Sequence, residues 1–244
     1  MMLEKRLFIA GKEVELLSNH VRLQLCTAGT ATFVVRSETQ PNQLDRVQLN
    51  IGYRDQSKPW MEGYITHVSQ QKEGLTLIRV KEACAVLSQQ LSMSIERPTL
   101  SDALNKLSLI TNLHFEVPNQ DYSQRYISHF SSQGTGFECL SKLERLYGVY
   151  DCVWYQQADN SIYFGAHPDS TFYNKPFDIP EEYITNQTLE MIRIVPFPVL
   201  RPGRIVNGQR INKLELCDDM MVAYWERNTF EPAWQMNNCQ LINV

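Results

Sequence analysis

The sequence predicts a mostly β protein of the α+β class, in which an α+β insert separates two strand-rich regions. Three observations predict this class. Apolar and polar residues alternate before residue 83, the spacing becomes helical over the middle of the chain, and strand-like runs return after about residue 183. Alternation buries one face of a strand, whereas a period near 3.6 residues buries one stripe of a helix. The changes of period therefore divide the chain into residues 1–82, 83–182 and 183–244.

The first region, residues 1–82, carries a regular strand pattern. Apolar residues alternate strictly with polar or small ones over 47–53, and similar runs follow at 63–70 and 75–81. Polar turn-forming segments, such as the one at 54–59, separate these runs. Short strands joined by polar turns favour an antiparallel barrel or a sandwich.

The insert opens with a short helical candidate at 83–91, and a stronger helix signal follows. Thr99 and Asp102 stand three residues apart, in a variant of the capping box that starts a helix. Leucines then recur on one face of the expected helix until Asn112, which ends it. A short strand is expected at 113–117.

A second helix is expected at 136–147. Thr135 and Glu138 form a capping pair at its start, apolar residues recur along one stripe, and Gly148 occupies the position of a C-cap glycine. A hairpin with a polar turn is then expected over 152–165. Helices and short strands in this order predict a compact α+β unit.

The second strand region follows a proline-containing segment at 167–182, which we interpret as a linker. Asn207-Gly208 lies between two apolar runs and is the strongest short hairpin signal in the chain. A second hairpin is expected over 211–227. The polar stretch at 228–244 is expected to form a tail that becomes ordered against a partner.

Composition and charge exclude several classes of protein. The 244 residues are 43% hydrophobic and 20% charged, which is a globular rather than a disordered composition. The formal net charge of −4, with no basic run, argues against a dedicated nucleic-acid-binding protein. No apolar run is long enough to cross a bilayer, and the run at 7–10 is too short for a signal-peptide core. We therefore expect synthesis in the cytoplasm.

Cysteines and histidines do not show the spacing of a metal site. The six cysteines are scattered without a Cys-x-x-Cys pair, so we expect reduced, buried thiols. No histidine lies three to five residues from another, so no helix-borne metal pair is expected. The residues concerned are Cys26, Cys84, Cys139, Cys152, Cys217 and Cys239, with His20, His67, His114, His129 and His167.

No catalytic motif emerges, and no catalytic, cofactor-binding or metal-binding residue is predicted. The Gly-x-Gly at 134–136 lacks the third glycine of a dinucleotide-binding motif, and no Gly-x-Ser-x-Gly elbow is present. Cys139 with His129 is a conceivable nucleophile and base, but the place of Cys139 beside Leu140 favours core packing. The chain is therefore predicted not to be an enzyme.

Short segments along the chain occur in an informative order. They read ATFVV at 31–35, MEGYI at 61–65, LTLI at 75–78, RPTLSDAL at 97–104, TNLHFEVP at 111–118, GTGFECL at 134–140, VWYQ at 153–156 and PVLRPG at 198–203, before Asn207-Gly208. In this order, over roughly residues 20–227, they resemble the phage baseplate hub family. That family comprises contractile-tail hubs, late control D proteins and the related part of type VI secretion spike proteins.

The resemblance implies two small antiparallel β-barrel domains, over residues 1–82 and 183–244, separated by the α+β insert with its linker over 83–182. It implies a homotrimer whose barrels form a pseudo-sixfold ring between the tail tube and the central spike, beside other baseplate proteins. Genome DNA would pass through the lumen without specific binding. The expected place is the baseplate of the virion tail, after synthesis in the host cytoplasm. The chain is short for the family, and the family carries no catalytic residues in this part.

Two rival functions stay open on the residues alone. Glu138 and Glu144 are candidate carboxylates of a tail-associated cell-wall hydrolase with the insert as its active domain, although capping and solvation also explain them. Trp154 or Trp225 is a candidate stacking residue of a carbohydrate-binding tail module, although packing within a strand also explains both.

Overall fold

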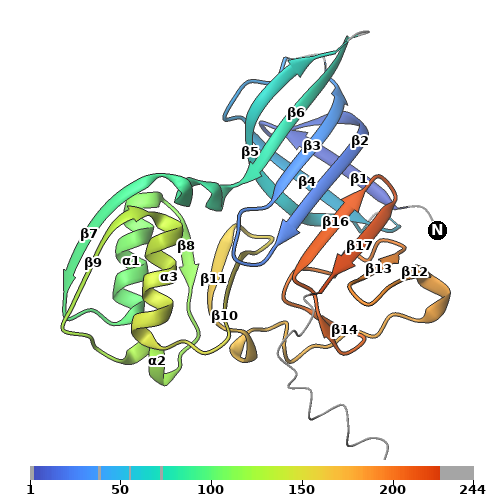
Figure 1. The fold of residues 1–244 in the computed structure, drawn as a ribbon. Helices are drawn as coiled ribbons and strands as arrows, with labels where there is room; N and C mark the ends of the chain where they lie inside the picture. The colour runs from blue at the N-terminus through green and yellow to red at the C-terminus, as the bar shows by residue number, and fades with distance from the viewer. Residues whose placement is uncertain (1–2, 38–39, 55, 72–73, 226–244) are drawn as a thin grey trace, which may run out of the picture.

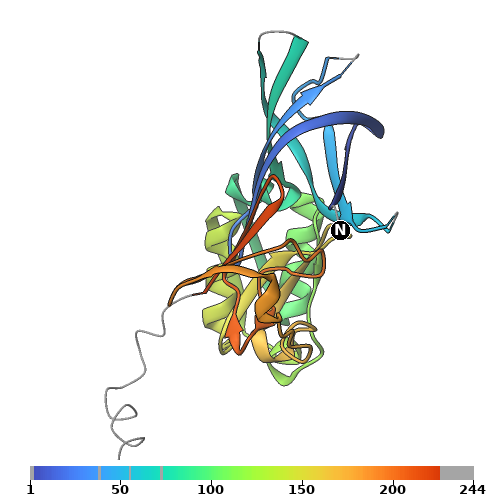
Figure 2. The same ribbon diagram turned by 90° about the vertical axis from the view of Figure 1, so that its right-hand side faces the viewer.

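The computed structural model describes residues 3–37, 40–54, 56–71 and 74–225. This part of the chain forms a β-barrel, a helix-containing insert and a second group of strands, which Figure 1 shows at the top, at the left and at the lower right. A view at right angles shows the barrel standing above the other two regions (Figure 2). The tail expected at 228–244 lies outside the described residues.

Six antiparallel strands close into the barrel. They are β1 (Glu4–Ile9), β2 (Lys12–Gln24), β3 (Thr30–Arg36), β4 (Arg46–Gly52), β5 (Lys58–Gln70) and β6 (Leu75–Glu82). Their order is β1-β4-β5-β6-β3-β2, and β1 pairs again with β2, which closes the sheet on itself. Inward residues such as those of β3 and β4 are buried and fill the interior. The predicted mostly β, α+β fold is confirmed, and its first region is a barrel rather than a sandwich.

Strand β2 joins the barrel to the second group of strands. Its start pairs with β1, through Val14 opposite Leu7, whereas its end at 20–24 pairs with β16 (Lys213–Cys217). Strand β16 therefore covers the part of the β2 edge that β1 leaves open. Because an open edge presents unpaired N–H and C=O groups, this pairing extends the barrel sheet and protects its edge.

The second group of strands belongs to the same ten-stranded sheet as the barrel. After β16 come β17 (Met220–Tyr224), β13 (Met191–Ile194) and β12 (Ile184–Gln187), with β12 as the outermost strand. In the described residues these strands extend the first barrel instead of closing separately, because β16 bonds to β2 and both groups share one hydrophobic core. The hairpin predicted at Asn207-Gly208 is present between β14 (Ile205–Val206) and β15 (Gln209–Arg210).

Both predicted helices of the insert are present. Helix α1 (Leu100–Thr111) and helix α3 (Gly136–Tyr147) each begin with the predicted reciprocal capping box. Left-handed residues end them, Asn112 with φ 56° and Gly148 with φ 62°. A one-turn helix, α2 (Asp121–Gln124), lies between them in the sequence.

The helices pack with a small sheet around a core of the insert's own. The sheet has the order β10-β11-β8, built from β10 (Cys152–Gln156), β11 (Ser161–Ala166) and β8 (His114–Glu116). Strands β10 and β11 form the predicted hairpin, and β8 joins in parallel. The separate core is consistent with an insert that is a compact unit.

The predicted helix at 83–91 is only partly right. A 3₁₀ helix, η2, covers Ala83–Ser88, and the chain then continues as β7 (Gln90–Glu96). Strand β7 pairs in antiparallel register with β9 (His129–Thr135), which was not predicted either. The alternation of Leu91, Met93 and Ile95 with serines was the available signal for β7.

The segment expected as a linker, 167–182, has little regular structure but is packed against its neighbours. It contains the 3₁₀ helix η3 (His167–Asp169) and leads into a second one, η4 (Glu181–Tyr183). Farther along, the backbone N–H of Phe177 donates to the carbonyl of Ile205 at 2.9 Å. Ile179 is buried in the core shared by the barrel and the second group of strands. The segment therefore holds the hairpin β14–β15 in place as well as connecting two regions.

Candidate functional site at the junction of the three regions

A buried carboxylate marks the junction of the barrel with the insert. Glu82, the last residue of β6, is 5% exposed. Its Oε2 accepts a hydrogen bond of 2.6 Å from the backbone N–H of Gly29, between β2 and β3. The thiol of Cys84, in the first turn of the insert, lies 3.9 Å from the same oxygen. The Glu82 carboxylate thus contacts two regions at once.

The opposite charge comes from the second strand region. Arg201, between β13 and β14, is 8% exposed, and its positive charge acts on Glu82. The Arg201 guanidinium lies over the ring of Trp60 on β5, 5.4 Å from the ring centroid, which is within cation–π range. The neighbouring carbonyl of Leu200 accepts a hydrogen bond of 3.3 Å from the Trp60 indole. These contacts tie the chain before β14 to the barrel.

Burial dominates the titration of this cluster. It raises the pKa of Glu82 to about 7, because removal from water disfavours the charged carboxylate. The Gly29 N–H and the charge of Arg201 oppose this rise in pKa without cancelling it. Burial lowers the pKa of Arg201 to about 10, which leaves it positively charged at neutral pH. Burial also raises the pKa of the Cys84 thiol well above its ordinary value, so this thiol stays protonated and unreactive.

The stability of the protein should therefore depend on the titration of Glu82. Its pKa is about 7 when folded and 4.5 ordinarily, so the folded chain binds more protons between these values and stability falls as pH rises through them. A shift of roughly 2.5 units corresponds to about 3 kcal/mol. In urea denaturation, the wild type should lose about 3 kcal/mol more than Glu82→Gln between about pH 4 and pH 8. Equal pH dependence of the two proteins would contradict this role of Glu82.

A buried amide makes a further connection between insert and barrel. Gln156 on β10 is 5% exposed, and its Oε1 accepts a 3.0 Å hydrogen bond from the backbone N–H of Cys84. Its Nε2 donates to the carbonyl of Glu62 at 3.0 Å and to Asn160 Oδ1 at 2.8 Å. The Glu62 carboxylate accepts in turn from Asn160 and, at 2.5 Å, from Arg46. Because Gln156 is fully bonded, its burial fixes the position of the insert on the barrel.

A second junction joins the insert to the hairpin β14–β15. Arg210 Nη1 lies 2.7 Å from each carboxylate oxygen of Asp151, just before β10. The buried His167 side chain has its Nε2 2.7 Å from the carbonyl oxygen of Gly203, so Nε2–H is the donor. Burial lowers the pKa of His167, which favours the neutral imidazole at pH 7. Its Nδ1 then faces Asp151 across 3.7 Å.

The structure does not bring the considered catalytic residues together. Glu138 is a capping residue, whose Oε2 accepts from the backbone N–H of Thr135 at 2.7 Å. Glu144 lies six residues farther along α3, so the two side chains leave the helix in different directions. Burial raises the pKa of Glu144, and the positive charge of Arg145 opposes this rise. The pair therefore lacks the shared cleft that a glycosidase requires.

Cys139 and His129 are separated by the strand β7. The Cys139 thiol is fully buried against Met93 Sδ, 3.5 Å away, and burial raises its pKa to about 11. His129 Nε2 instead lies 3.4 Å from the hydroxyl of Ser94. Met93 and Ser94 are consecutive residues of β7 and point to opposite faces. Cys139 is thus a core thiol without a base.

The two tryptophans considered for sugar stacking differ in environment. Trp154 on β10 is 6% exposed and stacks on Phe137 in the core of the insert, with ring centroids 5.6 Å apart. Its ring is therefore not accessible to a ligand. Trp225, the last described residue, is half-buried, and its indole N–H donates to the carbonyl of Leu189 at 2.7 Å.

Over residues 3–37, 40–54, 56–71 and 74–225, no three His, Cys, Asp or Glu side chains are arranged to hold a metal ion. None of the helices in this part of the chain has the length and apolar character needed to cross a membrane. No disulfide joins the five cysteines within this part of the chain, and Cys239 lies outside it.

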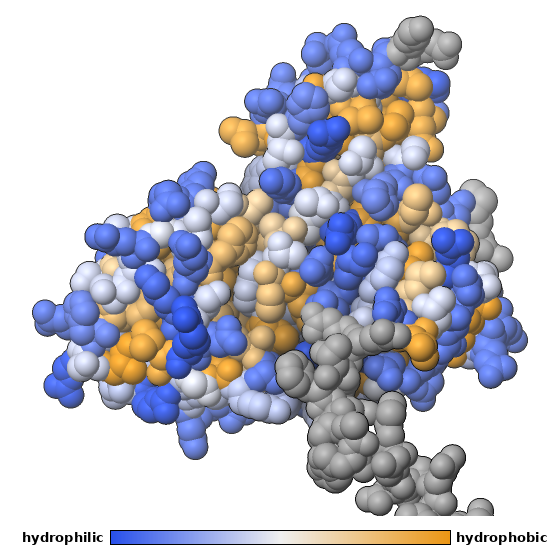
Figure 3. Space-filling view, in the orientation of Figure 1, coloured by the Kyte–Doolittle hydropathy of each residue, from blue (hydrophilic) through white to orange (hydrophobic). Residues whose placement is uncertain are grey.

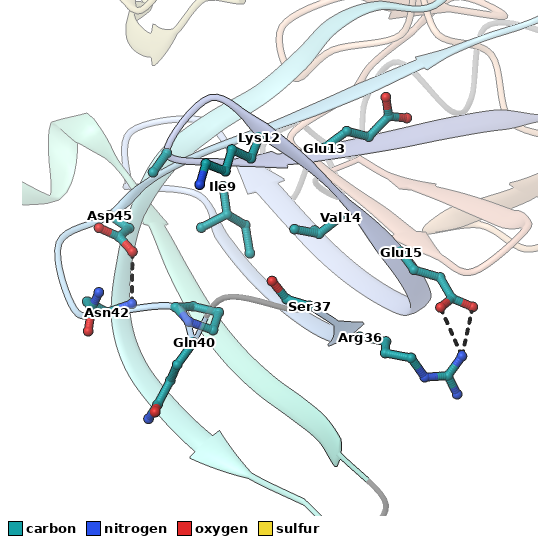
Figure 4. Close-up of a pocket in the computed structure, with 12 residues that line it drawn as sticks. Ile9, Lys12, Glu13, Val14, Glu15, Arg36, Ser37, Gln40, Asn42 and Asp45 are labelled. Atoms are coloured by element: carbon teal, nitrogen blue, oxygen red, sulfur yellow. Dashed lines mark hydrogen bonds and ion pairs between the residues drawn. The ribbon is translucent and has the colours of Figure 1, made fainter.

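A pocket of about 670 Å³ opens at the rim of the barrel, between the start of β2 and the chain after β3 (Figure 4). Glu15 and Arg36 form an ion pair of 2.9 Å on one side of it. On the other side the backbone N–H of Asn42 donates to Asp45 at 2.8 Å. These charged groups pair with neighbours instead of converging on one point, so the pocket does not have the geometry of an acid–base site.

Sequence reasoning missed the residues of both junctions. Glu82 and Arg201 are far apart in the chain, and although Arg201 lies in the segment PVLRPG, nothing in that segment indicates an interaction with Glu82. Asp151 and His167 flank the hairpin β10–β11, which was the available hint that they lie near each other. Their partner Arg210 follows the predicted Asn207-Gly208 turn, but the turn does not indicate what it packs against.

A phage protein is similar to this chain in sequence. No known protein-family profile matches the chain. The chain is 29% identical over 219 residues to an uncharacterised 58.7 kDa protein from the lys 3′ region of Haemophilus phage HP1. That alignment covers 90% of this chain and 41% of the relative, so the chain spans less than half of the relative's length.

Solved structures decide the fold. A 43 kDa tail protein of prophage MuSo2 from Shewanella oneidensis matches with a TM-score of 0.68, over 93% of this chain and 98% of that one. A tail protein from Neisseria meningitidis MC58 matches with a TM-score of 0.67, over 93% and 97%. The chain has the fold of phage tail proteins. Both sequences are 11% identical to this chain, so the shared feature is the fold.

The tail-protein fold also occurs in a secretion system. An Escherichia coli component of the type VI secretion system, described as structurally similar to the T4 bacteriophage tail proteins gp27 and gp5, matches with a TM-score of 0.59. The match covers 91% of this chain and 77% of that one, at 14% identity. Within this tail-protein fold, the junctions at Glu82 and Asp151 hold the insert against the strands.

Proposed function

We propose that the chain is a structural baseplate hub subunit of a phage or phage-like tail. In this role three copies form a pseudo-sixfold ring that joins the tail tube to the central spike, next to other baseplate proteins in the virion tail. The observation that carries the proposal is the shared fold over nearly the whole length of two tail proteins. The hub role and the trimer extend the resemblance of the sequence segments to baseplate hub proteins.

The open edge of the sheet supports an assembly role. Strand β12 pairs only with β13 among the described strands, so its other edge is available for pairing with another chain. Leu189, which follows β12, is 79% exposed, and larger hydrophobic areas appear over the barrel and the insert on the face in Figure 3. Exposed apolar surface beside a free strand edge suits contact between subunits.

The proposal gives the chain a structural role and no catalytic step. It is supported by the use of Glu138 as a helix cap and of Cys139 as a core residue. The net charge of −4 suits a lumen that DNA passes without specific binding, because uncompensated cations are what retain phosphates.

Light scattering coupled to size exclusion should detect the trimer. We expect a particle of three times the 28.3 kDa subunit mass, which stays constant on dilution through the micromolar range and is ring-shaped in negative-stain micrographs. Placing lysines on the β12 edge, with Thr185→Lys and Gln187→Lys together, should shift the protein towards monomer, because charged lysines on an edge strand disfavour its pairing with another chain.

Gln124→Lys, at an exposed position of the insert, is the matched control and should leave the mass unchanged. A wild type that stays monomeric, and that does not assemble when tail tube and spike proteins are added, would refute the hub proposal.

A further inference from the structure

A pocket of about 400 Å³ lies between the insert and the second group of strands. Four segments that are distant in the chain line it: the residues just before β10, the helix η3 with the loop after it, the hairpin β14–β15 with the residues after it, and the residue that follows β17. Its volume falls within the range of about 300–1,000 Å³ that small ligands occupy. Nothing in the hub proposal requires this pocket.

Aromatic side chains form the walls of the pocket. Tyr150 is 84% exposed and Tyr173 is 43% exposed, so both present ring surface to solvent. Tyr173 is held edge-on against the buried His167, with ring centroids 5.4 Å apart. Trp225 is held by its indole hydrogen bond to Leu189. The pocket therefore offers rings whose orientation is supported by the protein.

The polar groups of the pocket compensate one another in charge. Asp151 and Arg210, which both line the pocket, form an ion pair of 2.7 Å, and each side chain is about one-third exposed. Both contacts use Nη1 of Arg210, so the ion pair does not occupy the donors on Nε and Nη2. His167 donates to Gly203 and is neutral at pH 7 because burial lowers its pKa. Gln209 adds an exposed amide at the rim.

We propose that this pocket, walled by Tyr150, Tyr173 and Trp225 over the Asp151–Arg210 pair, binds a neutral carbohydrate. A sugar ring has apolar C–H faces that pack on aromatic rings, and hydroxyl groups that both donate and accept hydrogen bonds. The exposed carboxylate oxygens of Asp151 accept hydrogen bonds from the sugar hydroxyls. The Arg210 guanidinium and the Gln209 amide donate hydrogen bonds to the same hydroxyls. Because the ion pair cancels its own charge, the site favours an uncharged ligand.

A single-stranded nucleic acid is the main competing ligand, because bases also stack on aromatic rings. Its phosphates require uncompensated cations, whereas Arg210, the one arginine among the described residues that line this pocket, is paired with a carboxylate. The net charge of −4 further disfavours it. The carbohydrate is therefore the ligand that fits the rings and the charge balance together.

The test is an array of neutral oligosaccharides, including chitotetraose and maltotetraose, probed with the full chain. Each ligand that binds is then titrated by isothermal calorimetry. We expect at least one neutral oligosaccharide to bind, and Tyr150→Ala to weaken it at least tenfold. Arg210→Gln should weaken it similarly. Tyr150 is so exposed that its truncation leaves the fold unchanged, which circular dichroism will verify.

Tyr126→Ala is the matched control, since Tyr126 is 68% exposed on the insert and does not line the pocket. The affinity of Tyr126→Ala for each oligosaccharide should equal that of the wild type. The proposal is overturned if no neutral oligosaccharide binds at millimolar concentration, or if Tyr150→Ala binds as the wild type does. Binding of a thymidine 12-mer without any oligosaccharide would also overturn it. All of these outcomes are independent of the trimer measured for the hub proposal.

Discussion

Replacing Arg201 with methionine is expected to lower the free energy of unfolding, by about 1–2 kcal/mol more at pH 8 than at pH 5. The limit arises because Glu82, whose pKa is about 7, can take up a proton at pH 8 for about that cost. Arg201 is buried beside the buried carboxylate of Glu82, and it packs over Trp60. Removing the positive charge that acts on Glu82 leaves the carboxylate uncompensated in a medium that solvates it poorly. Urea denaturation at equilibrium, followed by tryptophan fluorescence, measures the loss.

The loss should depend on pH in a defined direction. At about pH 5, below the raised pKa of Glu82, its carboxyl is neutral in both proteins and only packing is lost. At pH 8 the variant must either bury an uncompensated Glu82 carboxylate or protonate Glu82, and either change lowers the stability of the folded state. The difference between Arg201→Met and the wild type should therefore grow from pH 5 to pH 8. A pH-independent difference would show that the two charges are not coupled.

Two further variants separate charge from packing. The double variant Glu82→Gln with Arg201→Met should be less destabilised than the sum of the single variants, because neither charge is then left alone. Arg36→Met removes an arginine from an ion pair in which both side chains are more than half exposed, and should cost less than about 1 kcal/mol. An equal loss for Arg36→Met and Arg201→Met would contradict the importance of burial.

Replacing Gly63 with alanine is expected to destabilise the protein by about 3 kcal/mol, the upper end of the usual cost of overpacking. Gly63 lies in the middle of β5, opposite Glu82 of β6. A Cβ at this position would lie 2.1 Å from the backbone carbonyl oxygen of Lys81, a separation that no side-chain movement relieves. Strand β6 would have to move away from β5 at the point where Glu82 enters the junction.

The control for Gly63 is another glycine of the same barrel. Gly11, between β1 and β2, has φ +80° and no atom within 4 Å of an added Cβ. Gly11→Ala should cost only about 1–2 kcal/mol, from the strained backbone conformation. Midpoints of urea denaturation compare the two variants directly. If Gly63→Ala unfolds at the same urea midpoint as Gly11→Ala, the space between β5 and β6 accommodates a Cβ at position 63, and the prediction is wrong.

Both predictions concern the place where the barrel continues into the insert. Glu82 ends β6, Gly63 lies opposite it, and Arg201 approaches from the second group of strands. For a hub subunit, this arrangement would keep the insert at a constant position while strand edges bind other chains. In the proposed hub role, a substitution at one of these residues is therefore expected to affect the assembly of the ring through the position of the insert as well as through stability.

Local elements of this protein are determined by its sequence. The capping pair Thr135 and Glu138 defines the start of α3, and Gly148 defines its end, because these signals act within a single turn of chain. The hairpin at Asn207-Gly208 follows from the same kind of local chemistry, since the turn requires left-handed residues. The class of the fold follows from the change of period along the chain, and it is confirmed.

Contacts between distant segments were decided only by the tertiary structure. The pairing of β2 with β16 depends on which strand edge remains open after β1 ends, and an alternating pattern shows a buried face but not a partner. The strand β7 was not predicted, and its first two residues were included in the helix expected at 83–91, because a few apolar residues fit either period. The charges of Glu82 and Arg201 act on each other because separate regions of the chain bury both side chains, and neither charge is marked by its neighbours in the sequence. The sequence thus determined the elements and their class, whereas burial and edge pairing determined which residues the junctions hold.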